Sequence, residues 1–123
     1  MARDIVIEIE KRQIEPGSIL TGRIEINYSG RFDSLVINSQ IENTSDHFSY
    51  TNIGGKAINH PYARISLMKH EIPESHKVEF EMTTNHIPTS YASNAKVRVT
   101  LIQEHKEIAS DTTHLEILGN SKP

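Results

Sequence analysis

The chain of 123 residues contains no cysteine and no tryptophan. The lack of cysteine excludes disulfide bonds, thiolate nucleophiles, iron–sulfur clusters and cysteine zinc sites, and it argues against a disulfide-stapled secreted scaffold. An excess of basic residues is also missing, because 13 Lys and Arg stand against 16 Asp and Glu. With no basic stripe to neutralise phosphates and only 3 Phe and 4 Tyr to stack on bases, nucleic acid is not an expected partner.

Long apolar runs are absent as well. The first apolar stretch, residues 5–7, is interrupted by Glu8 and is too short for a signal-peptide core or a membrane span. We therefore expect a protein that is not embedded in a membrane, and we expect it in the cytoplasm. The length suits one domain with a single core. We assign that domain to residues 1–118 and a polar tail to residues 119–123.

The chain does contain apolar residues at every second position, beginning with Ile5, Ile7 and Ile9. This period of two is typical of strands that bury one face. In residues 20–28 a slip of one position would turn charged side chains inward, so the register is well specified. The positions that we predict to face the core are Ile5, Ile7, Ile9, Leu20, Gly22, Ile24, Ile26, Tyr28, Leu35, Ile37, Ile41, Phe48, Tyr50, Val78, Phe80, Met82, Val97, Val99, Leu101, Leu115 and Ile117.

Residues 57–72 are compatible with two structures. Ile58, Tyr62 and Ile65 lie at roughly helical spacing, whereas Ile65 and Leu67 alternate as in a strand. Pro61 could open a short helix. We favour a strand, because the rest of the chain has strand periodicity.

Turn-forming pairs such as Pro16-Gly17, Ser29-Gly30 and Gly54-Gly55 separate the apolar segments. The spacing predicts an all-β protein, namely an antiparallel, immunoglobulin-like β-sandwich of about seven to nine strands. A closed barrel is the second choice.

Two stretches carry more specific information. In residues 14–26, Pro16 and Gly17 fit the centre of a type II turn, since proline presets its φ and glycine takes the positive φ that follows. Gly22 falls on the inward face of the next strand, where a glycine indicates a bulge or a close approach.

In the second stretch, Phe80 precedes the block formed by Pro88, Ser90 and Tyr91. The proline ends the preceding strand and directs the chain across to the other sheet. The Ser90 hydroxyl is placed to hydrogen-bond the loop backbone.

In order and separation, the two stretches resemble motifs of the arrestin-like domain family. The resemblance implies an arrestin-type β-sandwich of the kind found in arrestins and retromer subunits, here as a short single-domain microbial member. It further implies an adaptor or scaffold that binds other proteins, including cytoplasmic parts of membrane proteins.

Motifs for catalysis or cofactors are not found in the sequence. The 7 His residues are not spaced as metal-ligand pairs on a strand or helix, so we expect them at exposed loops and strand ends and predict no metal or cofactor. A nucleophile elbow and a phosphate loop are missing too. We therefore predict a non-enzymatic protein-interaction module.

Two alternatives stay open, an enzyme or small-ligand carrier with a pocket between the sheets, and an extracellular sandwich module. For the protein partner, or for a second copy of the chain, exposed strand edges are the expected contact. The candidate edges are residues 5–9 and 115–118 and the polar stretch 43–60. The contact residues that we predict on the two terminal edges are Val6, Glu8, Glu116 and Leu118.

Overall fold

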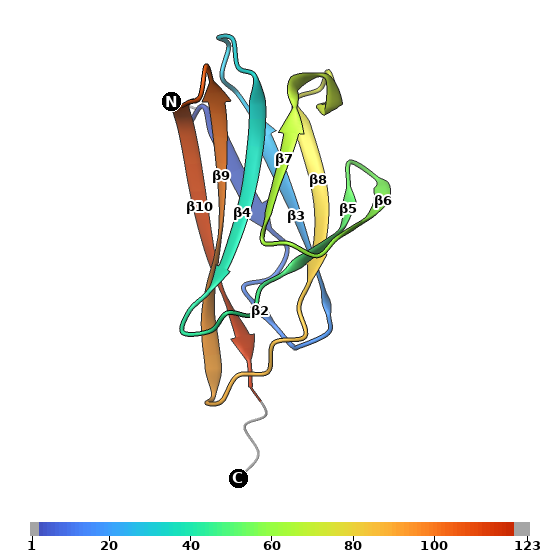
Figure 1. Ribbon diagram of the computed structural model, residues 1–123, viewed down its shortest axis with the longest axis vertical. Coiled ribbons are helices and arrows are strands. Elements are labelled where there is room, and N and C mark those ends of the chain that lie inside the picture. Colours follow the sequence, from blue (N-terminus) through green and yellow to red (C-terminus); the bar gives the residue numbers. More distant parts are fainter. Residues whose placement is uncertain (1–2, 120–123) are drawn as a thin grey trace.

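The computed structural model describes residues 3–119, which form two stacked five-stranded sheets (Figure 1). The first sheet has the order β1-β3-β8-β5-β6 and consists of β1 (Ile5–Ile9), β3 (Ile19–Ile26), β8 (Lys77–Thr83), β5 (Ser49–Ile53) and β6 (Lys56–His60). The second has the order β2-β10-β9-β4-β7 and consists of β2 (Gln13–Ile14), β10 (Lys106–Leu118), β9 (Ala92–Gln103), β4 (Ser34–Ile41) and β7 (Arg64–Met68). The predicted all-β sandwich is confirmed, and the closed barrel is not observed.

Neighbouring strands pair antiparallel, except that β2 runs parallel to β10. The chain passes from one sheet to the other after β1, β2, β3, β4, β6, β7 and β8. Because the two sheets pack face to face, each strand turns one of its two faces toward the shared interior, as the period of two predicts. Residues 3–119 form ten strands, more than the seven to nine predicted. One additional strand is β2, which at two residues is too short to show a period of two. Another arises because residues 57–72 contribute to two strands, β6 and β7.

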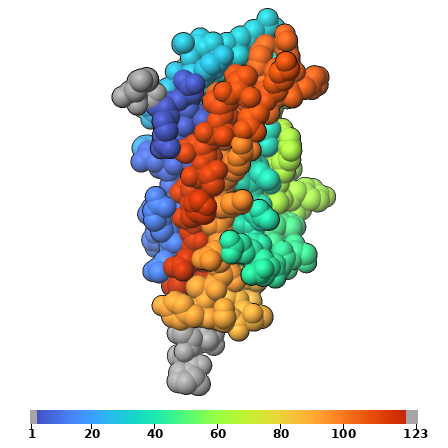
Figure 2. Space-filling view, turned by 90° about the vertical axis from the view of Figure 1, so that its left-hand side faces the viewer, coloured from blue at the N-terminus to red at the C-terminus, as the bar shows by residue number. Residues whose placement is uncertain are grey.

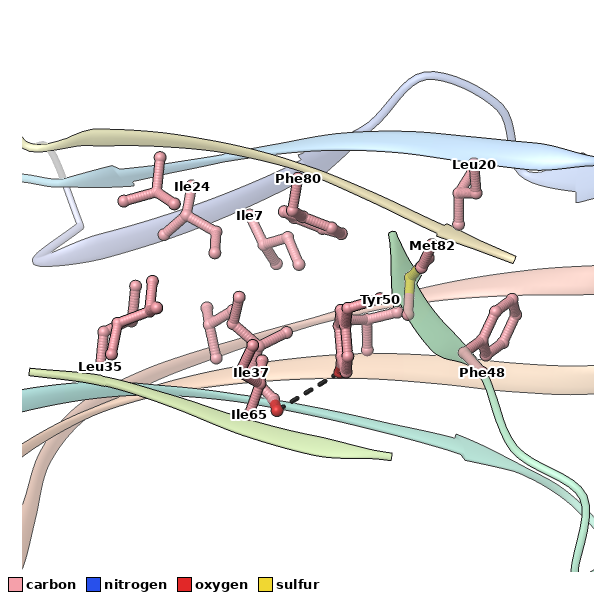
Figure 3. Packing of buried hydrophobic residues seen from close by; sticks show 14 of the residues in the cluster. Ile7, Leu20, Ile24, Leu35, Ile37, Phe48, Tyr50, Ile65, Phe80 and Met82 are labelled. Atoms are coloured by element: carbon pink, nitrogen blue, oxygen red, sulfur yellow. Dashed lines mark hydrogen bonds between the residues drawn. The ribbon is translucent and has the colours of Figure 1, made fainter. Parts of the chain in front are cut away.

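The interior between the sheets is filled with apolar side chains (Figure 3). Of the predicted core positions, all are buried except Ile9 and Tyr28, which pack against the core while remaining partly exposed. Side chains from the first sheet, such as Ile24 and Phe80, face Leu35 and Ile37 of the second. Full burial of one such side chain contributes about 1.5–3 kcal/mol, so this contact between sheets supplies most of the favourable free energy of folding.

Residues 57–72 form neither a single strand nor an α-helix. They include most of β6 in the first sheet, β7 in the second, and the 3-10 turn Lys69–Glu71. Pro61 lies in the crossing between the sheets, and Ile65 and Leu67 point inward from β7. The predicted strand is correct in type, but the crossing at Pro61 divides it.

The longest pairing joins β9 to β10 through a two-residue turn. Glu104 and His105 both have positive φ, 51° and 66°, as the tight hairpin turn between right-twisted strands requires. Neither residue is Gly, Asn or Asp, so the sequence carries no signal for this turn. The first half of β10 was accordingly not predicted.

The segment between β8 and β9 follows the prediction in its course, but the proline does not end the preceding strand, because β8 already ends at Thr83, five residues before Pro88. The segment leads the chain from the first sheet to the second, and Pro88 is buried within it. The Ser90 hydroxyl donates to the carbonyl oxygen of Ala92 at 3.3 Å, so the predicted bond to the loop backbone is confirmed. Of the predicted tail, Gly119 lies within the described residues and the remainder lies outside them.

Candidate functional site

The strand edges are the first place to look for a binding surface, because an edge presents unpaired backbone groups. Within residues 3–119 the sandwich has four edge strands: β1 and β6 in the first sheet, and β2 and β7 in the second. Strand β1 lies beside β10 of the other sheet, so these two strands form a seam along one side (Figure 2). Strands β6 and β7 follow each other in the chain and form the opposite side.

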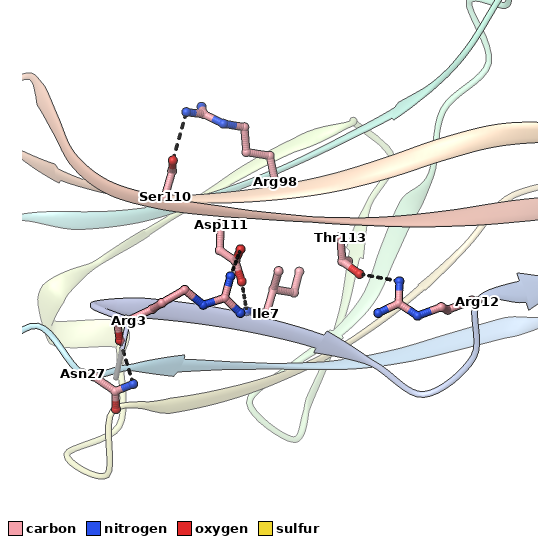
Figure 4. Close-up of polar contacts among 8 residues, drawn as sticks. All are labelled: Arg3, Ile7, Arg12, Asn27, Arg98, Ser110, Asp111 and Thr113. Carbon is pink, nitrogen blue, oxygen red and sulfur yellow. Dashed lines mark hydrogen bonds and ion pairs between the residues drawn. The ribbon is translucent and has the colours of Figure 1, made fainter. Parts of the chain in front are cut away.

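Side chains of β10 and of the chain before β2 bridge the seam (Figure 4). The backbone N–H of Ile7 donates to Asp111 Oδ2 at 3.0 Å, and Arg3 pairs with the other carboxylate oxygen at 2.9 Å. Arg12 donates to Thr113 Oγ1 at 3.4 Å and to the carbonyl oxygen of His114 at 3.2 Å. Of the outward backbone groups of β1, these contacts pair Ile7 N–H, and the two arginine side chains lie across the seam.

Glu8, one of the predicted contact residues, has its backbone turned toward β3. Glu10 N–H donates to Thr21 and Asn27 N–H donates to Asp4. Hydrogen-bonded pairs alternate along an antiparallel ladder, so Glu8 N–H also points to β3, opposite Arg23. A proline substitution at Glu8 would therefore remove a hydrogen bond of the β1–β3 ladder. It could not be used to test whether the outward edge of β1 binds a partner.

The predicted contact residues in β10 are also engaged within the fold. Glu116 N–H donates to the carbonyl oxygen of Arg12 at 2.8 Å, and its carboxylate accepts from Gln13 at 3.1 Å. Val6 and Leu118 are both partly buried. Large exposed apolar side chains occur elsewhere in residues 3–119, at Ile19, Tyr62, Met68, Ile87 and Tyr91.

Strand β7 has an outward edge on which only backbone groups near the two ends of the strand are hydrogen-bonded. Ser39 N–H donates to Ala63 and Lys69 N–H donates to Asp33, so by the same alternation Arg64, Ser66 and Met68 turn their backbone groups away from β4.

Two side chains limit this edge. Glu71 Oε1 accepts from Met68 N–H at 2.8 Å, and His60 Nε2 lies 2.7 Å from the carbonyl oxygen of Arg64. Between them, the outward backbone N–H and C=O of Ser66 have no hydrogen-bond partner among residues 3–119. The free edge is therefore short and centred on Ser66.

Apolar and basic groups surround the β7 edge. Tyr62 is 64% exposed and packs its ring edge-to-face on His60, with 5.4 Å between the centroids. Met68 is 48% exposed and borders a hollow of about 550 Å³. The other side chains that line this hollow include Arg31, Lys69, His70 and His105, with Asp33 as the acidic member. The end of the edge therefore favours an acidic or apolar ligand group.

A second hollow, of about 800 Å³, lies over β2, β9 and β10. Two hydrogen bonds join polar side chains of its lining: Gln13 donates to Glu116 at 3.1 Å, and Asn94 donates to Glu42 at 3.5 Å. Both carboxylates that line this hollow therefore accept a hydrogen bond from an amide side chain, and Lys11, Arg12 and His114 line it as well.

The motif residues of the sequence analysis hold the scaffold. Glu15–Ser18 form a turn in which Ser18 N–H donates to Glu15 at 3.1 Å and Gly17 has φ +83°, as a type II turn requires. Gly22 and Phe80 are buried and lie opposite each other in the β3–β8 ladder. Tyr91 is 68% exposed.

The expectation that the histidines lie exposed is wrong for His86. Its side chain is buried, and both ring nitrogens have side-chain partners, Asp46 and Ser93. Sequence reasoning missed this cluster because its members are 40 and 7 positions apart from His86. Within residues 3–119 no group of three or more His, Asp or Glu side chains is arranged to hold a metal ion.

No helix in the part of the chain described here is long and apolar enough to cross a membrane. No protein-family model matches the chain, and no curated protein matches it.

Several solved structures share the fold. The adhesin CfaE of enterotoxigenic E. coli matches with a TM-score of 0.61 at 11% identity, over 98% of this chain and 49% of the adhesin. The reeler domain of human F-spondin matches with a TM-score of 0.56 at 9% identity, over 93% of this chain and 89% of that domain. A conjugative transposon lipoprotein from Bacteroides eggerthii matches with a TM-score of 0.51 at 14% identity, over 98% and 100% of the two chains.

This chain therefore spans about half the length of the first adhesin. These three structures are an adhesin, a reeler domain and a lipoprotein, and none of the three is arrestin-like. At such identities the similarity shows a common β-sandwich fold.

Proposed function

We propose that this protein is a non-enzymatic interaction module, an adaptor or scaffold that binds an extended segment of another protein along β7. The observation that carries the proposal is the contrast between the two sides of the sandwich. On one side Asp111 and Arg12 bridge the seam, whereas on the other the backbone of Ser66 is left unpaired. An extended segment would pair with these groups and continue the second sheet.

The chemistry around the edge indicates what the partner segment contains. An acidic side chain beyond Met68 would lie near Lys69 and His70 in the basic hollow, and apolar side chains would contact Tyr62 and Met68. Edge pairing supplies affinity through main-chain bonds, and the side-chain contacts supply specificity. The partner is therefore an extended, acidic and partly apolar segment.

The filled interior supports this function over the alternative of an enzyme or ligand carrier with a pocket between the sheets. The side chains that meet there are Ile, Leu, Val, Phe, Met, Ala and Tyr50, in contact across the two layers. The arrestin-like resemblance, the cytoplasmic location and the attachment to a membrane through a partner stay predictions of the sequence. An extracellular module is the competing prediction, and self-association through β7 is a further one.

Selection from a displayed peptide library on the intact protein tests the proposal. We expect the selected peptides to be acidic and to slow hydrogen exchange at the Arg64 and Ser66 amides. Ser66→Pro removes the outward donor without removing a bond to β4, so it should abolish peptide binding. Ser66→Ala is the matched control, since it keeps the backbone N–H, and it should bind as the wild type does.

Two outcomes would refute the proposal. One is peptide binding that is equal in folded Ser66→Pro and Ser66→Ala. The other is a set of binding peptides that protects amides elsewhere and leaves Ser66 exchanging freely. Sedimentation velocity of the same variants distinguishes self-association, because a dimer formed through β7 would become a monomer in Ser66→Pro alone.

A further inference from the structure

Asp46, His86 and Ser93 form a hydrogen-bonded chain at one end of the sandwich. His86 Nδ1 lies 2.8 Å from Asp46 Oδ2, and His86 Nε2 lies 2.9 Å from Ser93 Oγ. The three residues come from different segments: the connection between β4 and β5, the crossing between β8 and β9, and the start of β9. The histidine side chain is 8% exposed and the aspartate side chain 58%.

The loop around His86 is held by its own hydrogen bonds. Thr84 Oγ1 donates to the carbonyl oxygen of His47 at 2.9 Å and accepts from His86 N–H at 3.2 Å. Asp46 N–H donates to Thr44 Oγ1 at 3.0 Å. These bonds fix both chain segments beside the imidazole, so the ring is positioned before any reagent arrives.

The partners also determine the tautomer of the imidazole. An ionised Asp46 carboxylate can only accept, so the proton of neutral His86 is on Nδ1. Nε2 is then the acceptor, and the Ser93 hydroxyl donates to it. A serine hydroxyl bonded to a histidine that a carboxylate orients is the arrangement that activates serine as a nucleophile.

The backbone at Ser93 sets a limit on the chemistry. Ser93 is paired with Ile117 in the β9–β10 ladder. Since Glu116 turns its N–H toward β2, Ile117 turns its backbone toward Ser93 and exchanges hydrogen bonds with it. The Ser93 N–H is therefore committed to the sheet and does not serve as an oxyanion donor, so both acylation and deacylation lack its stabilisation. An activated ester has a good leaving group and the acyl-serine has a poor one, so a single acylation is expected and not repeated turnover.

We propose that Ser93 is a covalent acylation site that reacts with activated esters. His86 Nε2 takes the hydroxyl proton as Ser93 Oγ bonds to the ester carbonyl carbon. The bond from that carbon to the ester's leaving oxygen then breaks, and in an aryl ester the leaving group departs as a phenolate. The imidazolium of His86 returns its proton to solvent. The product is an acyl-serine with neutral His86, and no oxidant or further reactant takes part.

p-Nitrophenyl acetate is a suitable probe. We expect the full-length protein to release one equivalent of p-nitrophenolate in a burst and to carry the acetyl group on Ser93 in peptide mass spectra. His86→Gln and Asp46→Asn should slow this acylation about a hundredfold, the low end of what a positioned base contributes. Asp46→Glu should restore part of the rate, because a carboxylate can again orient the ring.

Ser90→Ala is the matched control, since Ser90 is an exposed serine of the same loop whose hydroxyl contacts the Ala92 carbonyl oxygen. It should react as the wild type does, and Ser93→Ala should lose the burst. Absence of acetyl-Ser93 in the folded wild type would overturn the proposal. So would an acylation rate that is unchanged in Asp46→Asn, an exposed position where the variant is expected to fold and circular dichroism verifies it.

Discussion

Phe80 lies directly over Gly22 across the β3–β8 ladder, so closely that a Cβ at Gly22 would be 2.3 Å from Phe80 Cζ. Glycine is thus required at this inward position by the neighbouring ring and not by its own backbone conformation. Gly22→Ala should destabilise the protein by about 1–3 kcal/mol, as expected for overpacking. Urea unfolding monitored by circular dichroism measures the change.

The double variant Gly22→Ala with Phe80→Leu tests the same relationship. Because leucine leaves room for the added methyl group, the pair should be less destabilised than the sum of the two single variants by about 1 kcal/mol. Strict additivity would mean that the strain at Gly22 is relieved by some other movement.

Asp111 caps the edge of β1, and its removal should loosen the seam. Asp111→Ala leaves Ile7 N–H without its carboxylate partner, and the loss of a hydrogen bond to a charged group costs about 1.5–3 kcal/mol. Glu8→Ala removes an exposed ion pair with Arg23 and is the control, with an expected change of about 0.5 kcal/mol or less. Equal urea midpoints for the two variants would contradict this account of the seam.

The hydroxyl of Tyr50 contributes to stability in a pH-dependent way. It is buried and donates to the carbonyl oxygen of Ala63 at 2.8 Å, and burial raises the pKa of Tyr50 above its usual value. Because the pKa is raised in the folded protein, the stability contributed by the neutral hydroxyl is complete below the pKa of tyrosine in the unfolded chain, about 10. It is lost as the pH rises above that value.

Tyr50→Phe should therefore cost about 1 kcal/mol at neutral pH. It should also lose less stability than the wild type does between about pH 9 and about pH 11. Parallel alkaline curves for the two proteins, from urea titrations at each pH, would show that Tyr50 does not ionise on unfolding.

At acidic pH the pair of Asp46 and His86 is the group to examine. The hydrogen bond from His86 lowers the pKa of Asp46 below 3.8, against a smaller opposing effect of burial. A carboxyl group whose pKa is lower in the folded protein stabilises the fold at pH values above its unfolded pKa. This stabilisation is lost as the pH falls through the folded pKa. Below about pH 4, the thermal midpoint of Asp46→Asn should therefore fall less steeply with pH than that of the wild type. Glu74→Gln, at an exposed position, is the control, and its thermal midpoint should fall as steeply as that of the wild type.

Much of the fold can be predicted from the alternation of apolar and polar residues, because this alternation indicates which face of a strand is buried. Ile24 and Val97 were predicted inward for this reason and are fully buried. The first half of β10 lacks such a pattern: Ser110 and Thr112 give no apolar alternation, and its place is determined by pairing with β9. The site residues were harder still, since the burial of His86 and the isolation of Ser66 depend on which distant segments the fold brings beside them.

The bridge from Asp111 to the first strand has a consequence for synthesis of the protein. Its partners Arg3 and Ile7 precede it by 108 and 104 positions. The ribosome makes β1 before it makes Asp111, so the group that caps the edge of β1 is added 104 positions after Ile7. While these residues are being added, the nascent chain carries a β1 strand whose edge is uncapped, and loop closure over such separations slows folding. Until Asp111 reaches its partners and the seam closes, the exposed edge of β1 is where nascent chains can pair with one another.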